Sequence, residues 1–113
     1  MGQNEHIDHA IMIELQEIME DDFSVLLETY LVDSQAKLDA LDHAFILQDL
    51  NKIRDVAHGF KGSSLNMGAH ILAGFCASVE DLARALDFDG ARKASSKIIE
   101  EFEQVKIIIE QKL

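Results

Sequence analysis

Apolar residues recur at steps of three and four positions through most of this chain, and no proline interrupts the pattern. This spacing matches the α-helix, which has about 3.6 residues per turn, rather than the strict alternation of a β-strand. A proline inside a helix would remove a backbone hydrogen bond, so its absence leaves each long apolar-periodic stretch free to be helical. The sequence therefore predicts an all-α fold.

Capping and turn residues divide the pattern into five expected helices. Asp8 and Asp49 are suitable N-caps, and Gly68 suits the left-handed position that ends a helix. The expected helices cover residues 8–19, 21–47, 49–67, 69–86 and 91 onward, with a turn over 87–90. We expect residues 21–113 to form an antiparallel up-down-up-down four-helix bundle. Residues 1–20 are expected to form an N-terminal segment whose short helix caps one end.

The size and composition suit a single domain over residues 1–113, since 48% hydrophobic residues suffice for a compact core. The single cysteine, Cys76, cannot form a disulfide within the chain. Neither a secretory leader pattern nor an apolar run of membrane-spanning length is present. We therefore expect a cytoplasmic protein, and its complete core favours a monomer.

The charge distribution excludes two classes of partner. The whole chain has a net charge of −11, whereas residues 49–62 carry three cations, Lys52, Arg54 and Lys61, against Asp49 and Asp55. Nucleic-acid binding needs a wide basic surface, and an anionic membrane would repel so acidic a domain. The sequence therefore predicts neither a nucleic-acid nor a membrane partner, although one spot remains suited to a small anion.

A histidine lies within that spot. Helical phasing gives residues 50–67 a buried stripe of Ile53, Val56, Ala57, Phe60, Ser64 and Met67, and it places His58 on the outer face. Gly62, one turn further on, leaves an edge of the imidazole open, and glycine inside a helix costs about 1 kcal/mol relative to alanine. Lys61 and Arg54 occupy neighbouring rows of the helix. The pattern predicts a place to hold a phosphoryl group, which needs such counter-charge.

The expected hairpin between the third and fourth helices brings a carboxylate to this histidine. A hairpin that turns near residue 69 places His58 level with Glu80. A hydrogen bond across the hairpin would hold one ring nitrogen and leave the other free as a nucleophile. Glu80 has a second expected partner, Arg84, one turn further along the same helix.

The segment AHGFKGSSLNMGAHILAGFCASVEDLA, residues 57–83, resembles the histidine-containing phosphotransfer (HPt) domains of bacterial multistep phosphorelays. The likeness extends over roughly residues 21–112. The family pattern is matched without departure at His58, Lys61, Gly62, Ser64, Gly68, Ala69, Leu72, Cys76 and Glu80. A histidine with only the lysine and the glycine would be a weak match, whereas the full spacing over two helices is specific.

The resemblance implies that the chain is a stand-alone phosphorelay intermediate, and it implies a function for these residues. His58 would accept a phosphoryl group on Nε2 from a receiver-domain aspartyl phosphate and pass it to another receiver aspartate, without autokinase activity. Lys61 would neutralise the phosphate, Gly62 would give access and Glu80 would orient the ring. The partners would be response-regulator receiver domains and a hybrid sensor histidine kinase, docking at Arg54, Ser64 and Leu65. The chain would need no cofactor of its own, because the receiver brings Mg²⁺.

Two other interpretations stay open at this point. The chain could be a non-catalytic helical adaptor that docks on receiver or kinase domains through the surface around His58. His6 and His9, beside Glu5 and Asp8, could bind a metal ion, but two imidazoles at a fraying terminus make a poor site, so we expect no metal site.

Overall fold

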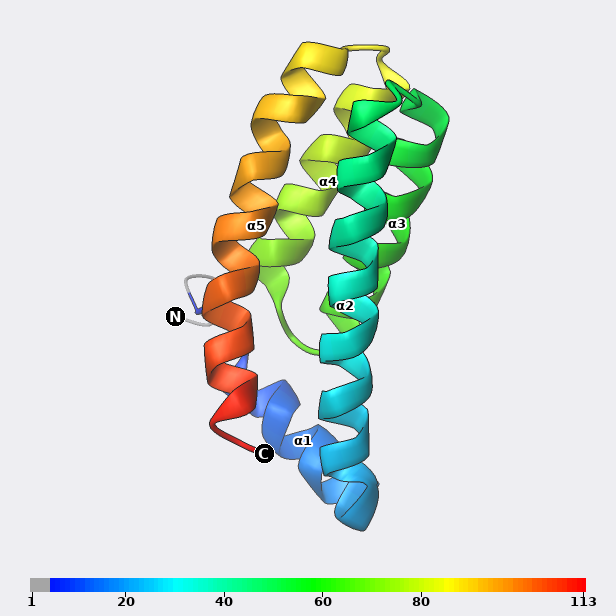
Figure 1. Ribbon diagram of the computed structural model, residues 1–113. Helices are drawn as coiled ribbons and strands as arrows, with labels where there is room; N and C mark the ends of the chain where they lie inside the picture. Colours follow the sequence, from blue (N-terminus) through cyan, green and yellow to red (C-terminus); the bar gives the residue numbers. More distant parts are fainter. Residues whose placement is uncertain (1–4) are drawn as a thin grey trace.

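The computed structural model describes residues 5–113, which are helical over most of their length (Figure 1). The elements are α1 (His9–Met19), the short 3-10 helix η2 (Glu20–Asp22), α2 (Phe23–Ile46), α3 (Leu50–Asn66), α4 (His70–Arg84) and α5 (Phe88–Glu110). This confirms the all-α prediction. The first four residues of the expected N-terminal segment lie outside the described residues.

The last four helices form the expected antiparallel bundle. Figure 1 shows α2, α3, α4 and α5 running alternately up and down, with α1 crossing the lower end beneath the α3–α4 turn. The most extensive packing is between α3 and α4, followed by α4 with α5 and α2 with α3. The molecule is elongated, with extents of 42 × 27 × 19 Å. The functional region predicted from sequence therefore lies in the best-packed pair of helices.

Capping residues mark the beginnings and ends of the helices largely where the sequence predicts them. The side chain of Asp8 accepts a hydrogen bond from the Ala10 backbone, and that of Asp49 accepts one from Lys52. Gly68 has a φ of 79°, in the left-handed region where a side chain would be strained.

The junction of α4 and α5 differs from the prediction. The fourth helix ends at Arg84 rather than Leu86, because Leu86 takes a φ of 61° and is 76% exposed. The fifth helix begins at Phe88 rather than Ala91, because the Asp87 side chain accepts a hydrogen bond from the Gly90 backbone and caps it. The expected turn over 87–90 is therefore the first turn of α5.

The core fixes how α3 is rotated. Ile53, Ala57 and Phe60 are fully buried, and the Phe60 ring meets the Phe102 ring of α5 edge to face at 5.9 Å. Because these residues face inward, the opposite side of α3 faces solvent.

The residues before α1 are attached to the bundle at three places. Ile7 is 1% exposed and belongs to the core. The Asp8 backbone nitrogen donates to the Gly68 carbonyl at 2.9 Å, and His6 Nδ1 lies 2.7 Å from Glu101 Oε2 on α5. The N-terminal segment thereby joins the α3–α4 turn to α5, a connection that the sequence analysis did not predict.

Within residues 5–113, none of the helices combines the length and the apolar character that crossing a bilayer requires.

Candidate functional site

His58 projects from the solvent-facing side of α3, and its side chain is 64% exposed. This is the orientation that the helical phasing predicts. The two residues next to His58 in the sequence differ in burial, since Ala57 is fully buried and Gly59 is exposed. The imidazole is thus accessible from solvent on this face.

A buried carboxylate from the neighbouring helix holds the ring. Glu80 of α4 is 3% exposed, and its Oε2 lies 2.9 Å from His58 Nδ1. Lys61 donates from Nζ to Glu80 Oε1 at 2.8 Å, and Arg84 donates from Nη2 to Oε2 at 2.7 Å. The hairpin register therefore places Glu80 beside His58 as predicted, and the alternative pairing of Glu80 with Arg84 is present at the same time.

The charge on Glu80 decides which nitrogen of His58 is free. The hydrogen bond from Lys61, followed by those from Arg84 and His58, lowers the pKa of Glu80 from 4.5 to about 2, against the opposing effect of burial. An ionised carboxylate only accepts hydrogen bonds, so the facing Nδ1 must carry a proton. In a neutral imidazole the proton on Nδ1 leaves Nε2 with a free lone pair. We assign the tautomer from this hydrogen-bond network.

The cations around Glu80 exceed its single negative charge. Lys61 and Arg84 both form ion pairs with the one carboxylate, so the cluster carries a net charge of +1 before His58 is counted. A phosphoryl group on His58 would arrive beside this excess positive charge. Arg84 was not among the site residues predicted from the sequence, although its position one turn after Glu80 was the signal for it.

Two further predicted residues lie on the same exposed face. Gly62 is exposed, and a Cβ added there would meet no atom within 4 Å. Packing within the chain therefore gives no reason for the glycine, which is consistent with access for a partner. Leu65 is 45% exposed, which agrees with its predicted place outside the core.

The charge of Arg54, a third residue predicted for this face, is already partly compensated. Its guanidinium points to the neighbouring Asp55, with Nη2 3.0 Å from Oδ1.

Ser64 contradicts its predicted place on the docking surface. It is 0% exposed, and its Oγ lies 2.8 Å from the hydroxyl of Tyr30 on α2. Six positions along a helix rotate a side chain by about 240°, which turns Ser64 away from His58 and into the bundle. Its place in the buried stripe of the sequence already indicated this, and the serine has a structural rather than a docking position.

Cys76 is a core residue in this structure. It is fully buried, and burial raises the pKa of its thiol to about 12, with a smaller contribution from the charge of Glu80. The reactive thiolate is therefore suppressed, and Cys76 serves as a small apolar residue behind the site.

No group of three or more histidine, cysteine, aspartate or glutamate side chains in residues 5–113 is arranged to hold a metal ion. Of the two N-terminal histidines considered for such a site, His6 pairs instead with Glu101.

Comparison with known proteins decides the family. The model of the Hpt domain family matches residues 25–111. The chain belongs to the Hpt family. The structure of this Hpt domain is also similar to the crystal structure of histidine-containing phosphotransfer protein B from Pseudomonas aeruginosa PAO1, with a TM-score of 0.93 and 38% sequence identity. That match covers 96% of this chain and 95% of the other. No curated protein matches the sequence. These findings support a phosphotransfer role in a phosphorelay.

Proposed function

We propose that this Hpt domain is a phosphorelay intermediate in which His58 carries the phosphoryl group. The observation that carries the proposal is the pairing of an exposed imidazole with a buried, ionised Glu80 through Nδ1. In the neutral imidazole that pairing puts the proton on Nδ1, so Nε2 carries the lone pair and is directed away from the carboxylate. A nucleophile with a fixed tautomer and an open approach is what acceptance of a phosphoryl group requires.

The transfer needs no acid or base from this chain. The Nε2 lone pair attacks the phosphorus of a receiver aspartyl phosphate, the N–P bond forms, and the P–O bond to the aspartate breaks. The aspartate leaves as a carboxylate, and a second receiver aspartate takes the phosphoryl group by the reverse reaction. Positive charge develops on the imidazole as the N–P bond forms, and Glu80 stabilises it through Nδ1. Lys61 is positioned to offset the charge on the phosphoryl oxygens.

The partners in this proposal are response-regulator receiver domains and a hybrid sensor histidine kinase. They dock on the face that carries His58, Gly62 and Leu65, with Arg54 at its edge. We expect the receiver to supply Mg²⁺ and this chain to hold no cofactor. The sequence has no glycine-rich phosphate loop, so we expect no autokinase activity.

Incubation with a radiolabelled, phosphorylated receiver domain tests the proposal. The wild type should acquire a label that is acid-labile and base-stable, and His58→Gln should acquire none. His43→Gln is the matched control, because His43 is also exposed on a helix but has no such cluster, and it should be labelled like the wild type. A wild type that stays unlabelled with every receiver of the source genome would instead support a non-catalytic adaptor.

A further inference from the structure

The side chain of Lys37 on α2 reaches the backbone of α3 next to His58. A Cβ added at Gly59, the residue after His58, would lie 3.4 Å from Lys37 Cε, and the ammonium nitrogen is bonded directly to that carbon. The Lys37 side chain is only 23% exposed, so its stem is packed against the protein while its charge stays at the surface. The contact therefore keeps one cation of α2 beside the exposed histidine.

Lys37 and Lys61 lie on opposite sides of His58. At about 100° per residue, Gly59 is about 100° around α3 from His58 in one direction, and Lys61 is about 60° away in the other. Lys61 faces α4, where its Nζ donates to Glu80 Oε1 at 2.8 Å. Gly59 faces α2, where it meets Lys37. The imidazole thus stands between two lysines that come from different helices.

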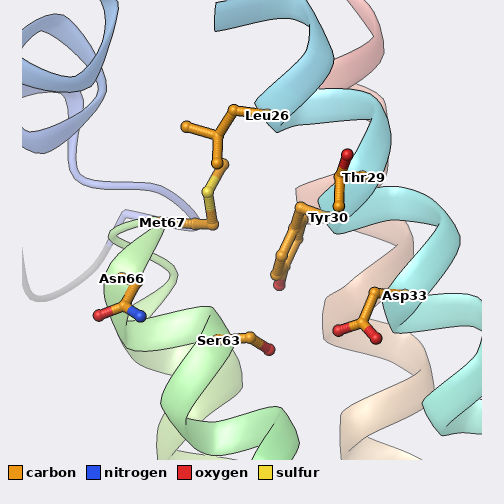
Figure 2. A pocket seen from close by; sticks show the side chains of 7 residues that line it. All are labelled: Leu26, Thr29, Tyr30, Asp33, Ser63, Asn66 and Met67. Atoms are coloured by element: carbon orange, nitrogen blue, oxygen red, sulfur yellow. The ribbon is translucent and has the colours of Figure 1, made fainter. Parts of the chain in front are cut away.

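An acid of the same helix holds the Lys37 ammonium in this structure. Asp33, one turn earlier on α2, forms an ion pair with Lys37 and is 50% exposed. Figure 2 shows the Asp33 carboxylate pointing into the hollow between α2 and α3, toward Ser63, which also lines that hollow. The Ser63 hydroxyl donates instead to the Phe60 carbonyl at 3.2 Å. An exposed ion pair contributes only about 0–1 kcal/mol, so Lys37 can change partner at little cost.

A phosphoryl group on His58 would bring more negative charge than the α4 side can balance. Such a group carries up to about two negative charges near neutral pH. The cluster of Lys61, Arg84 and Glu80 has an excess of one positive charge, and both of its cations are bound to the buried carboxylate. Lys37 is the only lysine or arginine of α2, and it has only a surface carboxylate to leave. It is therefore the cation on the α2 side that can supply further counter-charge.

We propose that Lys37 stabilises the charge of phosphorylated His58, and that Asp33 competes with the phosphoryl group for the Lys37 ammonium. The inference rests on the proposed function, since it concerns the product of transfer to His58. When the phosphoryl group is present, the ammonium exchanges the Asp33 carboxylate for a phosphoryl oxygen, while the stem stays against Gly59. The exchange moves no proton and breaks no covalent bond. Lys37 and Asp33 therefore have opposite effects on the stability of phosphorylated His58.

The equilibrium constant for transfer from a phosphorylated receiver to this protein measures that stability. Between the free proteins the constant does not depend on how tightly they dock. Lys37→Met keeps the stem and removes the charge, and we expect it to lower the constant about threefold, within the range of an exposed ion pair. Asp33→Asn releases the ammonium and should raise the constant by a similar factor. Both effects should shrink at high salt.

A double variant tests whether Asp33 acts through Lys37. Lys37→Met combined with Asp33→Asn should match Lys37→Met alone, because no ammonium is left to release. A direct repulsion between Asp33 and the phosphoryl group would instead persist in the double variant. Lys93→Met and Asp89→Asn are the matched controls, since these residues are exposed and four positions apart on α5, and both should leave the constant unchanged.

Nuclear magnetic resonance of the lysine ammonium groups adds a measurement that needs no receiver. Labelling of His58 by phosphoramidate, a small donor that needs no docking, should shift the Lys37 signal and leave that of Lys93 in place. An equilibrium constant that Lys37→Met leaves unchanged, or an effect of Asp33→Asn that persists in the double variant, would overturn the inference with the proposed function intact. A wild type that phosphoramidate labels but no receiver phosphorylates would reject the proposed function. An unshifted Lys37 signal on labelling would then overturn the role of Lys37 as well.

Discussion

His58 and Glu80 are 22 positions apart, yet His58 Nδ1 lies 2.9 Å from Glu80 Oε2. The same carboxylate also accepts hydrogen bonds from Lys61 and Arg84. A buried charge is costly unless it is paired and hydrogen-bonded, and here three donors satisfy it. Glu80 thus has two tasks, because it orients the imidazole and it keeps two cations beside it.

Substitutions at Glu80 should separate these tasks. Glu80→Ala removes the acceptor for Nδ1, so we expect labelling by phosphoramidate to slow about tenfold, or about 1.4 kcal/mol in activation free energy. Glu80→Gln keeps an oxygen that can accept from Nδ1 and should lose less. The exposed Glu103 on α5 provides the control, since Glu103→Ala should not change the rate. Equal rates for Glu80→Ala and the wild type would show that the hydrogen bond does not orient the ring for reaction.

The depressed pKa of Glu80 predicts how stability changes in acid. A carboxylate whose folded pKa is about 2, below its ordinary value of 4.5, stabilises the fold fully above the ordinary value. That contribution is lost as the pH falls from 4.5 to about 2, because over this range the unfolded state binds the proton and the folded state does not. Thermal unfolding midpoints measured between these two pH values should fall more steeply for the wild type than for Glu80→Gln. Parallel profiles would contradict the ion-paired state of Glu80.

Gly62→Ala should separate stability from docking. A Cβ at position 62 meets no atom of the chain, and alanine favours a helix interior over glycine, so unfolding should cost about 1 kcal/mol more. The methyl group would nonetheless stand beside His58, where a receiver must approach, so transfer from the receiver should slow. Gly74→Ala on α4 is the matched control, because it is also exposed with open space at its Cβ position. It should gain the same stability, with transfer unchanged.

The buried hydrogen bond between Tyr30 and Ser64 should affect stability alone. Ser64→Ala leaves the Tyr30 hydroxyl without its partner, and we expect a loss of about 1–3 kcal/mol in the free energy of unfolding. Tyr30→Phe removes the other partner, and the double variant should lose about 1 kcal/mol less than the sum of the single variants. Urea unfolding measures these values. A changed receiver affinity for Ser64→Ala, with the fold intact, would return Ser64 to the docking surface.

The periodicity of the sequence predicted the helices and their pairing because one apolar stripe per helix can be buried in few ways. Asp8, Asp49 and Gly68 marked helix ends because capping depends on the local chain. The α4–α5 junction was less predictable, since an exposed leucine, Leu86, takes a backbone conformation that its residue type does not favour.

The site residues, too, were predictable from the sequence only in part. The place of His58 and its distance from Glu80 follow from helix geometry and a short turn, so the sequence predicted them. The full set of donors on Glu80 depends on side-chain conformations that span two helices, which spacing alone leaves open. Ser64 was wrongly assigned to the surface because the family pattern includes it, although the period of the helix placed it inside.

The connection between α3 and α4 consists of residues 67–69 alone, and all four members of the His58 cluster lie on these two helices. The cluster is therefore carried by a single hairpin, and α2 contributes none of its four side chains. Substitutions on the outer face of α2 therefore leave the four hydrogen-bonded side chains in place. The outer surface of α2 can change in evolution without any rebuilding of the hairpin that holds His58.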